Sequence, residues 1–174
     1  MLLAVVMGVL FLTEIKHDGI KMQNNLSHNI TTNKPLWLIH FVSTYQRLSI
    51  DNLDLLATIY HQDVTFIDPM HQVEGFDELY KYFDSLYQNL SSCVFDINNV
   101  IAEGDEAAIY WKMSYQHPKL NQGEVVTVLG SSHVKGRDDK VFYHRDYLDL
   151  GAMLYEQLPL FGKLTKWIKA KAAS

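Results

Sequence analysis

The sequence has only one cysteine, Cys93, among its 174 residues. A single thiol cannot form an intrachain disulfide, and it leaves no cluster of thiolates for a structural zinc site. A secreted scaffold held by disulfides is therefore excluded. The sequence favours a reducing compartment, and we expect the protein to be cytoplasmic.

Motifs for metals, phosphates and nucleophilic catalysis are also missing. The eight histidines form neither a His-Glu-x-x-His motif nor a His-x-His pair. The chain has no glycine-rich phosphate loop and no Gly-x-Ser-x-Gly elbow. A metal site built from His133, His144 and Asp146 is conceivable, but their spacing does not demand one. We therefore expect no metal and no cofactor.

The charge of the chain is negative and unevenly distributed. A net charge of −5 argues against a general nucleic-acid binder. Four lysines and no acid follow residue 162, so that the rest of the chain carries −9. An acidic body with a basic end suggests that this end docks on its own domain, on a partner or on anionic lipid.

The N-terminal segment does not meet the criteria for a targeting sequence. Residues 1–12 are apolar but shorter than the roughly 20 residues of a membrane span, and they lack a basic n-region. A polar run, residues 23–33, looks disordered. We interpret residues 1–33 as a disordered or mis-annotated extension, with Met22 as an alternative start, in preference to a signal anchor.

Hydrophobic periodicity predicts helices first and strands afterwards. Helices are expected at residues 34–48, 51–60 and 76–86, and a short strand at 64–68. Four further strands are expected at 93–103, 107–117, 124–135 and 140–150, with hairpin turns at 104–105 and 136–139. This order predicts one α+β domain over residues 34–150 and excludes a parallel Rossmann sheet. Residues 151–174 form a basic, amphipathic helical tail.

One step in this pattern is the Asp68-Pro69 dipeptide, in which proline holds Asp68 in an extended conformation. Gly75 then opens the third predicted helix. Together with the element order and the last hairpin, residues 143–147, these features resemble the nuclear transport factor 2-like superfamily, which includes ketosteroid isomerases and SnoaL-like polyketide cyclases. The resemblance covers about residues 35–150. It implies a cone-shaped fold with three N-terminal helices packed on a curved antiparallel sheet.

The resemblance directs attention to acid–base chemistry. Asp68 matches the position of the proton-shuttling base in ketosteroid isomerases. Strand alternation, with Ser131 placed opposite His144, puts His144 and Asp146 on one face of the last hairpin, and the resemblance implies that this face lies inside the cone. We expect Asp68 as the base, His144 or Tyr45 as the polarising donor and Asp146 as the residue that orients it. The expected ligand pocket is formed by Trp37, Phe41, Phe66, Phe83, Trp111, Ser131, His133 and Phe142.

The departures from ketosteroid isomerase matter for the reaction. Thr44 stands at the position of that enzyme's oxyanion-binding tyrosine, with Tyr45 one residue away. No acid lies near Ser131, where the enzyme holds a protonated aspartate. Without this neutral acid a large electrostatic contribution is lost, so we do not expect steroid isomerisation. The SnoaL-like branch is the closer analogy.

Two functions therefore remain open. The chain is either a cofactor-independent isomerase or cyclase acting on an apolar, carbonyl-bearing ligand, or a non-catalytic module that binds a lipid-like ligand or a partner. Asp68 is also an ordinary turn former, and His144 with Asp146 is also a satisfied core pair or a dimer contact.

Two partner interactions are expected at the surface. Tyr143, Arg145 and Tyr147 lie on the outer sheet face, and residues of these types favour a two-fold homodimer that light scattering would detect. In the tail, Pro159 and Gly162 should interrupt the helix, and Leu160, Leu164, Trp167 and Ile168 form an apolar stripe. We expect this stripe to pack on the cone as a lid, with peripheral membrane binding as the alternative.

Overall fold

The computed structural model describes residues 34–172. The chain divides into two units, residues 1–34 and 35–174, and every element below belongs to the second unit. The predicted N-terminal extension, residues 1–33, lies outside the described residues.

The first described helix, α2 (Leu36–Tyr45), begins two residues later and ends three residues earlier than the predicted helix at 34–48. The predicted second helix is much shorter than expected. A 3-10 turn, η1 (Leu53–Leu55), leads into the single-turn α3 (Leu56–Ile59), and Tyr60 already has extended backbone angles. Residues 64–67, Val-Thr-Phe-Ile, are β-branched or aromatic and favour a strand, which extends back to Tyr60.

Helix α4 (Phe76–Tyr87) matches the predicted third helix to within one residue. Gly75 precedes it with a φ of 83°, a conformation that glycine adopts without steric cost. Two acids in the first turn, Asp77 and Glu78, complement the positive end of the helix dipole. The buried residues Leu79, Phe83 and Tyr87 recur every four positions and form the face that packs on the sheet.

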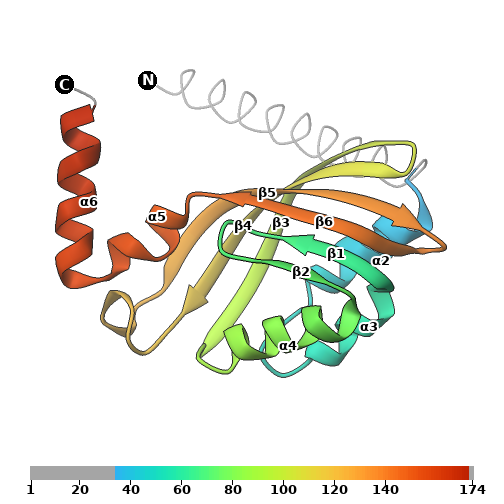
Figure 1. Ribbon diagram of the computed structural model, residues 1–174, viewed down its shortest axis with the longest axis horizontal. Coiled ribbons are helices and arrows are strands. Elements are labelled where there is room, and N and C mark those ends of the chain that lie inside the picture. The colour runs from blue at the N-terminus through green and yellow to red at the C-terminus, as the bar shows by residue number, and fades with distance from the viewer. Residues whose placement is uncertain (1–33, 173–174) are drawn as a thin grey trace, which may run out of the picture. The chain divides into compact units, whose positions relative to one another are not determined.

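The sheet has six strands in the order β2-β1-β6-β5-β4-β3, and the helices α2, α3 and α4 lie on one of its faces (Figure 1). The predicted four-stranded meander is confirmed. The strands are β1 (Tyr60–Ile67), β2 (Gln72–Glu74), β3 (Ser92–Glu103), β4 (Glu106–Gln116), β5 (Val126–Arg137) and β6 (Lys140–Leu148).

The expectation of a wholly antiparallel sheet is wrong at one pair. β1 pairs with β6 in parallel, whereas all other neighbours are antiparallel. After β1 the chain passes through α4 to the far edge of the sheet, and the meander then returns strand by strand. β6 thus lies beside β1 and runs in the same direction. The long connection between them, which includes α4 and the strands β3 to β5, allows this parallel pairing, because parallel strands cannot be joined by a short hairpin.

The predicted register of the last hairpin is also wrong. Its turn is the two-residue Asp138-Asp139, with φ of 50° and 59°, one residue later than expected. Gly136 instead lies in β5, where glycine is needed because a Cβ would approach the indole of Trp37 to 2.2 Å. A bulge at Phe142 shifts the pairing again, so that Ser132 faces Asp146 and Val134 faces His144.

β3 forms the far edge of the described sheet. Its pairing with β4 skips Asn98, so this edge strand also contains a bulge. On the outer face of β6, Arg145 and Tyr147 are exposed and the guanidinium lies 5.1 Å from the tyrosine ring centre. Homodimerisation through this face stays a prediction.

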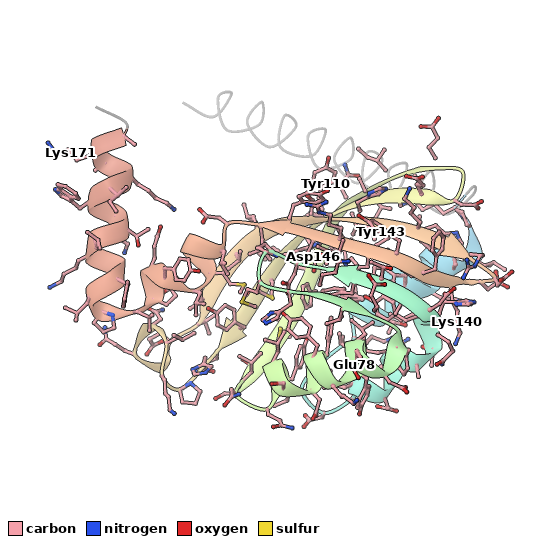
Figure 2. The ribbon with its side chains drawn as sticks, in the orientation of Figure 1. Glu78, Tyr110, Lys140, Tyr143, Asp146 and Lys171 are labelled. Carbon is pink, nitrogen blue, oxygen red and sulfur yellow. The ribbon has the colours of Figure 1, made fainter. Side chains whose placement is uncertain are left out.

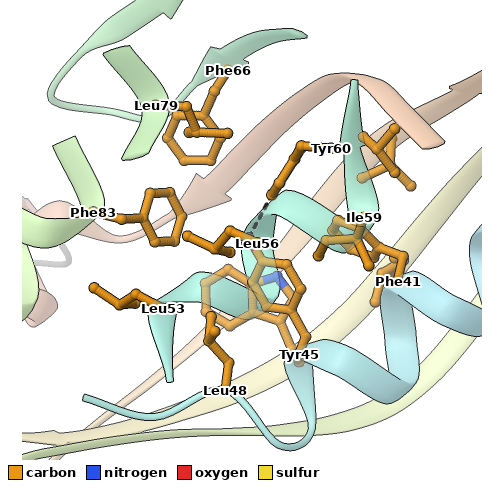
Figure 3. Close-up of a cluster of buried hydrophobic side chains, with 14 of the residues drawn as sticks. Phe41, Tyr45, Leu48, Leu53, Leu56, Ile59, Tyr60, Phe66, Leu79 and Phe83 are labelled. Carbon is orange, nitrogen blue, oxygen red and sulfur yellow. Dashed lines mark hydrogen bonds between the residues drawn. The ribbon is translucent and has the colours of Figure 1, made fainter. Parts of the chain in front are cut away.

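The core lies between α2–α4 and the sheet (Figure 3). Leu38, Leu56 and Leu79 are completely buried, and each such side chain stabilises the fold by about 1.5–3 kcal/mol. Several aromatic rings fill the remaining volume, among them Phe41, Tyr45, Tyr60, Phe66 and Phe83. The core between the helices and the sheet is therefore rich in aromatic side chains.

The tail consists of α5 (Leu150–Met153), the 3-10 turn η3 (Tyr155–Gln157) and α6 (Pro159–Ala172). Proline stands at the start of α6, where its missing N–H costs no hydrogen bond. The predicted interruption at Gly162 is wrong, since α6 continues through it. Across residues 34–172 no helix combines the length and the apolar character needed to cross a membrane.

Candidate functional site

A pocket of about 420 Å³ opens between α4, the meander and the segment before α6. This volume is within the range of about 300–1,000 Å³ that is typical of small-molecule sites. Most of the wall is apolar, formed by residues such as Phe66, Phe83, Phe95, Trp111, Met113, Leu148 and Met153. Two carboxylates, Asp68 and Asp146, interrupt it.

Asp146 lies on β6, between β5 and β1, and its side chain is 18% exposed (Figure 2). Directly behind it is His144, of which only 1% is exposed. The His144 Nε2 atom lies 2.9 Å from Asp146 Oδ1, and Nδ1 lies 2.5 Å from the hydroxyl of Tyr60. The imidazole is thus held at both nitrogens, with Asp146 on its pocket side.

The rings around His144 fix its orientation. Phe41 and Phe66 pack edge-on against the imidazole, at centroid distances of 5.4 and 5.0 Å. Tyr60 stacks nearly parallel to it, and the Tyr45 hydroxyl lies 2.6 Å from the Tyr60 hydroxyl. Figure 3 shows this last hydrogen bond inside the core. The buried pair of tyrosines therefore extends the polar chain from the pocket into the protein.

A second branch reaches Asp146 from the meander. The Trp111 indole Nε1 donates to Ser132 Oγ at 2.8 Å, and the Ser132 hydroxyl donates to Asp146 Oδ1 at 2.5 Å. Indole can only donate, which sets the direction of this branch. On the other branch, the neutral His144 tautomer with its proton on Nε2 donates a hydrogen bond to Asp146. The same tautomer accepts a hydrogen bond from the Tyr60 hydroxyl at Nδ1. Within residues 34–172 both branches end on Oδ1, so the other carboxylate oxygen, Oδ2, remains available to a ligand.

Burial controls the ionisation of the tyrosines in this network. Desolvation raises the pKa of Tyr45 well above its ordinary value, and the charge of Asp146 raises it further. Desolvation likewise raises the pKa of Tyr60, with the neighbouring Tyr45 as the next cause. Both hydroxyls therefore stay protonated at neutral pH. Tyr45 lies at the inner end of the chain and is outside the pocket lining, so its predicted contact with ligand is not present.

Asp68 lies at the rim of the pocket, beside Pro69 and Met70. Its Oδ1 accepts hydrogen bonds from the backbone N–H groups of Met70 and His71, at 2.7 and 2.8 Å. The Tyr82 hydroxyl donates to Oδ2 at 2.5 Å. Both carboxylate oxygens of Asp68 therefore already accept hydrogen bonds from the protein. This is the geometry expected if Asp68 is an ordinary turn-forming residue.

The structure places five predicted pocket residues outside the pocket. Trp37 lies beneath the β5–β6 turn in a separate surface depression, and Phe41 packs behind His144. The shifted register turns Ser131 and His133 to the outer face, where His133 binds Glu106. Phe142 is the bulge residue and lies 4.8 Å from the Arg137 guanidinium. Phe66, Phe83 and Trp111 do line the pocket.

Sequence reasoning did not identify four residues of the site, Tyr60, Ser132, Tyr87 and Cys93. The sequence predicts Tyr60 within a helix, and the predicted register places Ser131 on the inner face of the sheet and Ser132 on the outer face. Burial raises the pKa of the Cys93 thiol to about 11, so it is a poor nucleophile. Burial also raises the pKa of Tyr87 well above normal, and its buried hydroxyl has no hydrogen-bond partner within residues 34–172.

A metal centre receives no support from the part of the chain that is described. Among residues 34–172, no three histidine, cysteine or acidic side chains converge in a way that would hold a metal ion. The remaining polar neighbours of His144 and Asp146 are the hydroxyls of Tyr60 and Ser132, which form hydrogen bonds with them.

Comparisons with known proteins agree with this architecture. The sequence profile of the family described as SnoaL-like domain matches residues 41–144. No curated protein matches the sequence of the chain.

Solved structures with the same fold have little sequence identity to the chain. A proposed SnoaL-like polyketide cyclase from Jannaschia sp. CCS1 is 16% identical, with a TM-score of 0.61 over 71% of this chain and 94% of that one. A protein of ketosteroid isomerase-like fold from Catenulispora acidiphila, crystallised with trimethylamine, is 15% identical, with a TM-score of 0.61 over 73% and 96%. TerC, crystallised with polyporic acid, is 14% identical, with a TM-score of 0.60 over 68% and 95%.

Proposed function

The chain belongs to the SnoaL-like domain family, and from this premise we propose that it binds an apolar, carbonyl-bearing small molecule and transfers a proton on it. One observation carries the proposal. The pocket has a largely apolar wall, and the carboxylate of Asp146 enters it with a buried His144 directly behind. The reaction is of the isomerase or cyclase type and needs no cofactor.

In this proposal Asp146 is the general base, in place of Asp68. Ser132 and His144 both donate to Oδ1, which fixes the carboxylate and turns Oδ2 towards the ligand. A positioned carboxylate beside an acidic C–H group removes its proton and can return it to another atom of the ligand. General acid–base catalysis of this kind contributes about 10²–10⁴-fold to a rate.

Removal of a proton next to a carbonyl leaves negative charge on the carbonyl oxygen, which requires a donor. Tyr87 is suited to this, since it lines the pocket and stays neutral at physiological pH. The Tyr87 hydroxyl is buried and has no hydrogen-bond partner within residues 34–172, so it loses none by donating to a ligand. We assign Tyr87 as the donor to the oxyanion.

Binding without catalysis is the second candidate function. It is favoured by the completeness of the network, in which each buried polar group around His144 already has a partner. Such networks also occur in proteins where they only satisfy buried groups. The ligand would then be lipid-like and held by the apolar wall.

Deuterium exchange separates the two functions without knowledge of the natural substrate. The protein is incubated in D₂O with a panel of apolar ketones and β-dicarbonyl compounds, and mass spectrometry detects deuterium at the carbon next to the carbonyl. Deuterium exchange that is faster with the wild type than with the Asp146→Asn variant supports proton transfer. Saturable binding, seen as a change in tryptophan fluorescence, without exchange assigns the binding function. Failure of the whole panel in both assays contradicts the proposal.

A further inference from the structure

Helix α6 is attached to the rest of the domain by its polar side. The Lys169 ammonium lies 2.9 Å from Asp149 and 2.6 Å from Glu156. One residue on the same side, Gly162, is buried, and a Cβ there would come within 2.4 Å of the Glu156 carbonyl oxygen. The attached side of α6 is therefore made of a glycine contact and ion pairs.

The apolar side of the same helix faces away from these contacts. Five large side chains that share this side are at least half exposed: Leu160 (82%), Phe161 (58%), Leu164 (52%), Trp167 (60%) and Ile168 (51%). We call these residues the α6 stripe. Their spacing of one, three and four residues places them on one face of the helix. The predicted lid is thus wrong, because the stripe does not pack on the cone.

An exposed apolar stripe of this size usually marks a binding surface. The charges beside it indicate what binds. Lys163 and Lys166 lie between the stripe and the attached side, and α6 contains four lysines and no acid. The rest of the chain has a net charge of −9, so α6 stands out as a helix with a net positive charge. Figure 1 shows α6 projecting beyond α5 at one end of the sheet, and Figure 2 marks Lys171 on it.

We propose that α6 binds the surface of an anionic membrane. The helix would lie in the plane of the interface, with the α6 stripe among the acyl chains and Trp167 at the boundary with the headgroups. Its lysines would be attracted to anionic lipid. With 14 residues, α6 is shorter than the roughly 20 needed to span a bilayer, so it binds as a peripheral element. This inference does not depend on the proposed function of the pocket.

Flotation with lipid vesicles tests the proposal on the full-length protein. Vesicles of phosphatidylcholine alone are compared with vesicles that also contain phosphatidylserine. We expect the wild type to float only with the anionic vesicles, and added salt to weaken this binding. Trp167→Glu should lower the affinity by more than about tenfold, because it places a charge in the stripe. Replacement of both Lys163 and Lys166 by Gln should lower it by about 30-fold.

Matched variants control for unspecific effects. Ile101→Glu introduces the same charge at a similarly exposed residue (57%) of β3, and Lys119→Gln removes a lysine outside α6. Both should float like the wild type, and circular dichroism should show that all variants are folded. The proposal is overturned if the wild type does not float, or if Ile101→Glu loses as much binding as Trp167→Glu. It is also overturned if Trp167→Glu only converts a dimer to a monomer in light scattering while no protein floats.

Discussion

The Asp146→Asn variant is expected to lose about 10²–10⁴-fold in turnover with any substrate that the exchange assay identifies. Asparagine keeps the shape of the side chain, and its oxygen can still accept from Ser132 and His144. It cannot accept a proton at neutral pH. Because the lost interaction acts in the transition state, kcat should fall while KM changes little.

The matched control for this variant is Asp68→Asn at the rim of the same pocket. Its side-chain oxygen would still accept from the N–H groups of Met70 and His71, so the turn is preserved. We expect turnover within a few fold of the wild type. Equal losses in both variants would show that the pocket requires its overall negative charge, and a loss confined to Asp68→Asn would restore Asp68 as the base.

The Gly130→Ala variant is expected to lower the free energy of unfolding by about 3 kcal/mol, the upper end of the usual cost of overpacking. A Cβ at this position would lie 2.2 to 2.7 Å from three atoms of the Trp111 ring. The ring is held in place, because Nε1 donates to Ser132 and the ring packs nearly perpendicular to that of Phe95, with the ring centres 5.5 Å apart. The added methyl group therefore displaces either Trp111 or the β5 backbone.

Chemical denaturation followed by circular dichroism measures this effect. Ser131→Ala, the adjacent residue on the outer face of β5, is the control and should change stability by less than about 0.5 kcal/mol. Since Trp111 also lines the pocket, Gly130→Ala should weaken binding of any apolar probe as well. Wild-type stability in Gly130→Ala would mean that Trp111 relaxes freely, and the pocket wall would then be softer than the structure indicates.

Much of the fold could be predicted from the sequence because its signals are local. The four meander strands and α4 follow from alternation, turn residues and four-residue spacing. The parallel pairing of β1 with β6 has no local signal, since it joins residues about 80 positions apart. His144 and Asp146 share the inner face of β6, as expected: alternation within one strand puts them on the same face without knowledge of the partner strand, and the family resemblance indicates which face is inner.

The candidate site could be predicted only in part, since one small irregularity, the bulge at Phe142, reverses the faces of β5. The sequence suggested that Gly136 belongs to the turn, whereas its lack of a Cβ serves the contact with Trp37. Asp138 and Asp139 take the left-handed positions instead, which moves each pairing by two residues and keeps the predicted faces. The bulge at Phe142 then adds one residue and reverses them. For this reason Ser132, and not Ser131, meets Asp146. Asp68 is the expected base only through the family resemblance. The Asp-Pro dipeptide by itself predicts a turn in which the Asp68 carboxylate accepts hydrogen bonds from nearby backbone N–H groups.

The bulge at Asn98 has a consequence for how copies of this protein meet. A 12-residue edge strand with exposed Val94 and Ile101 could template the addition of a foreign strand, the first step of fibre growth. The unpaired Asn98 breaks the regular row of backbone donors and acceptors along that edge. Continuous edge-to-edge sheets are thereby disfavoured. The predicted two-fold contact through the outer face of β6 would instead close on itself and would not propagate.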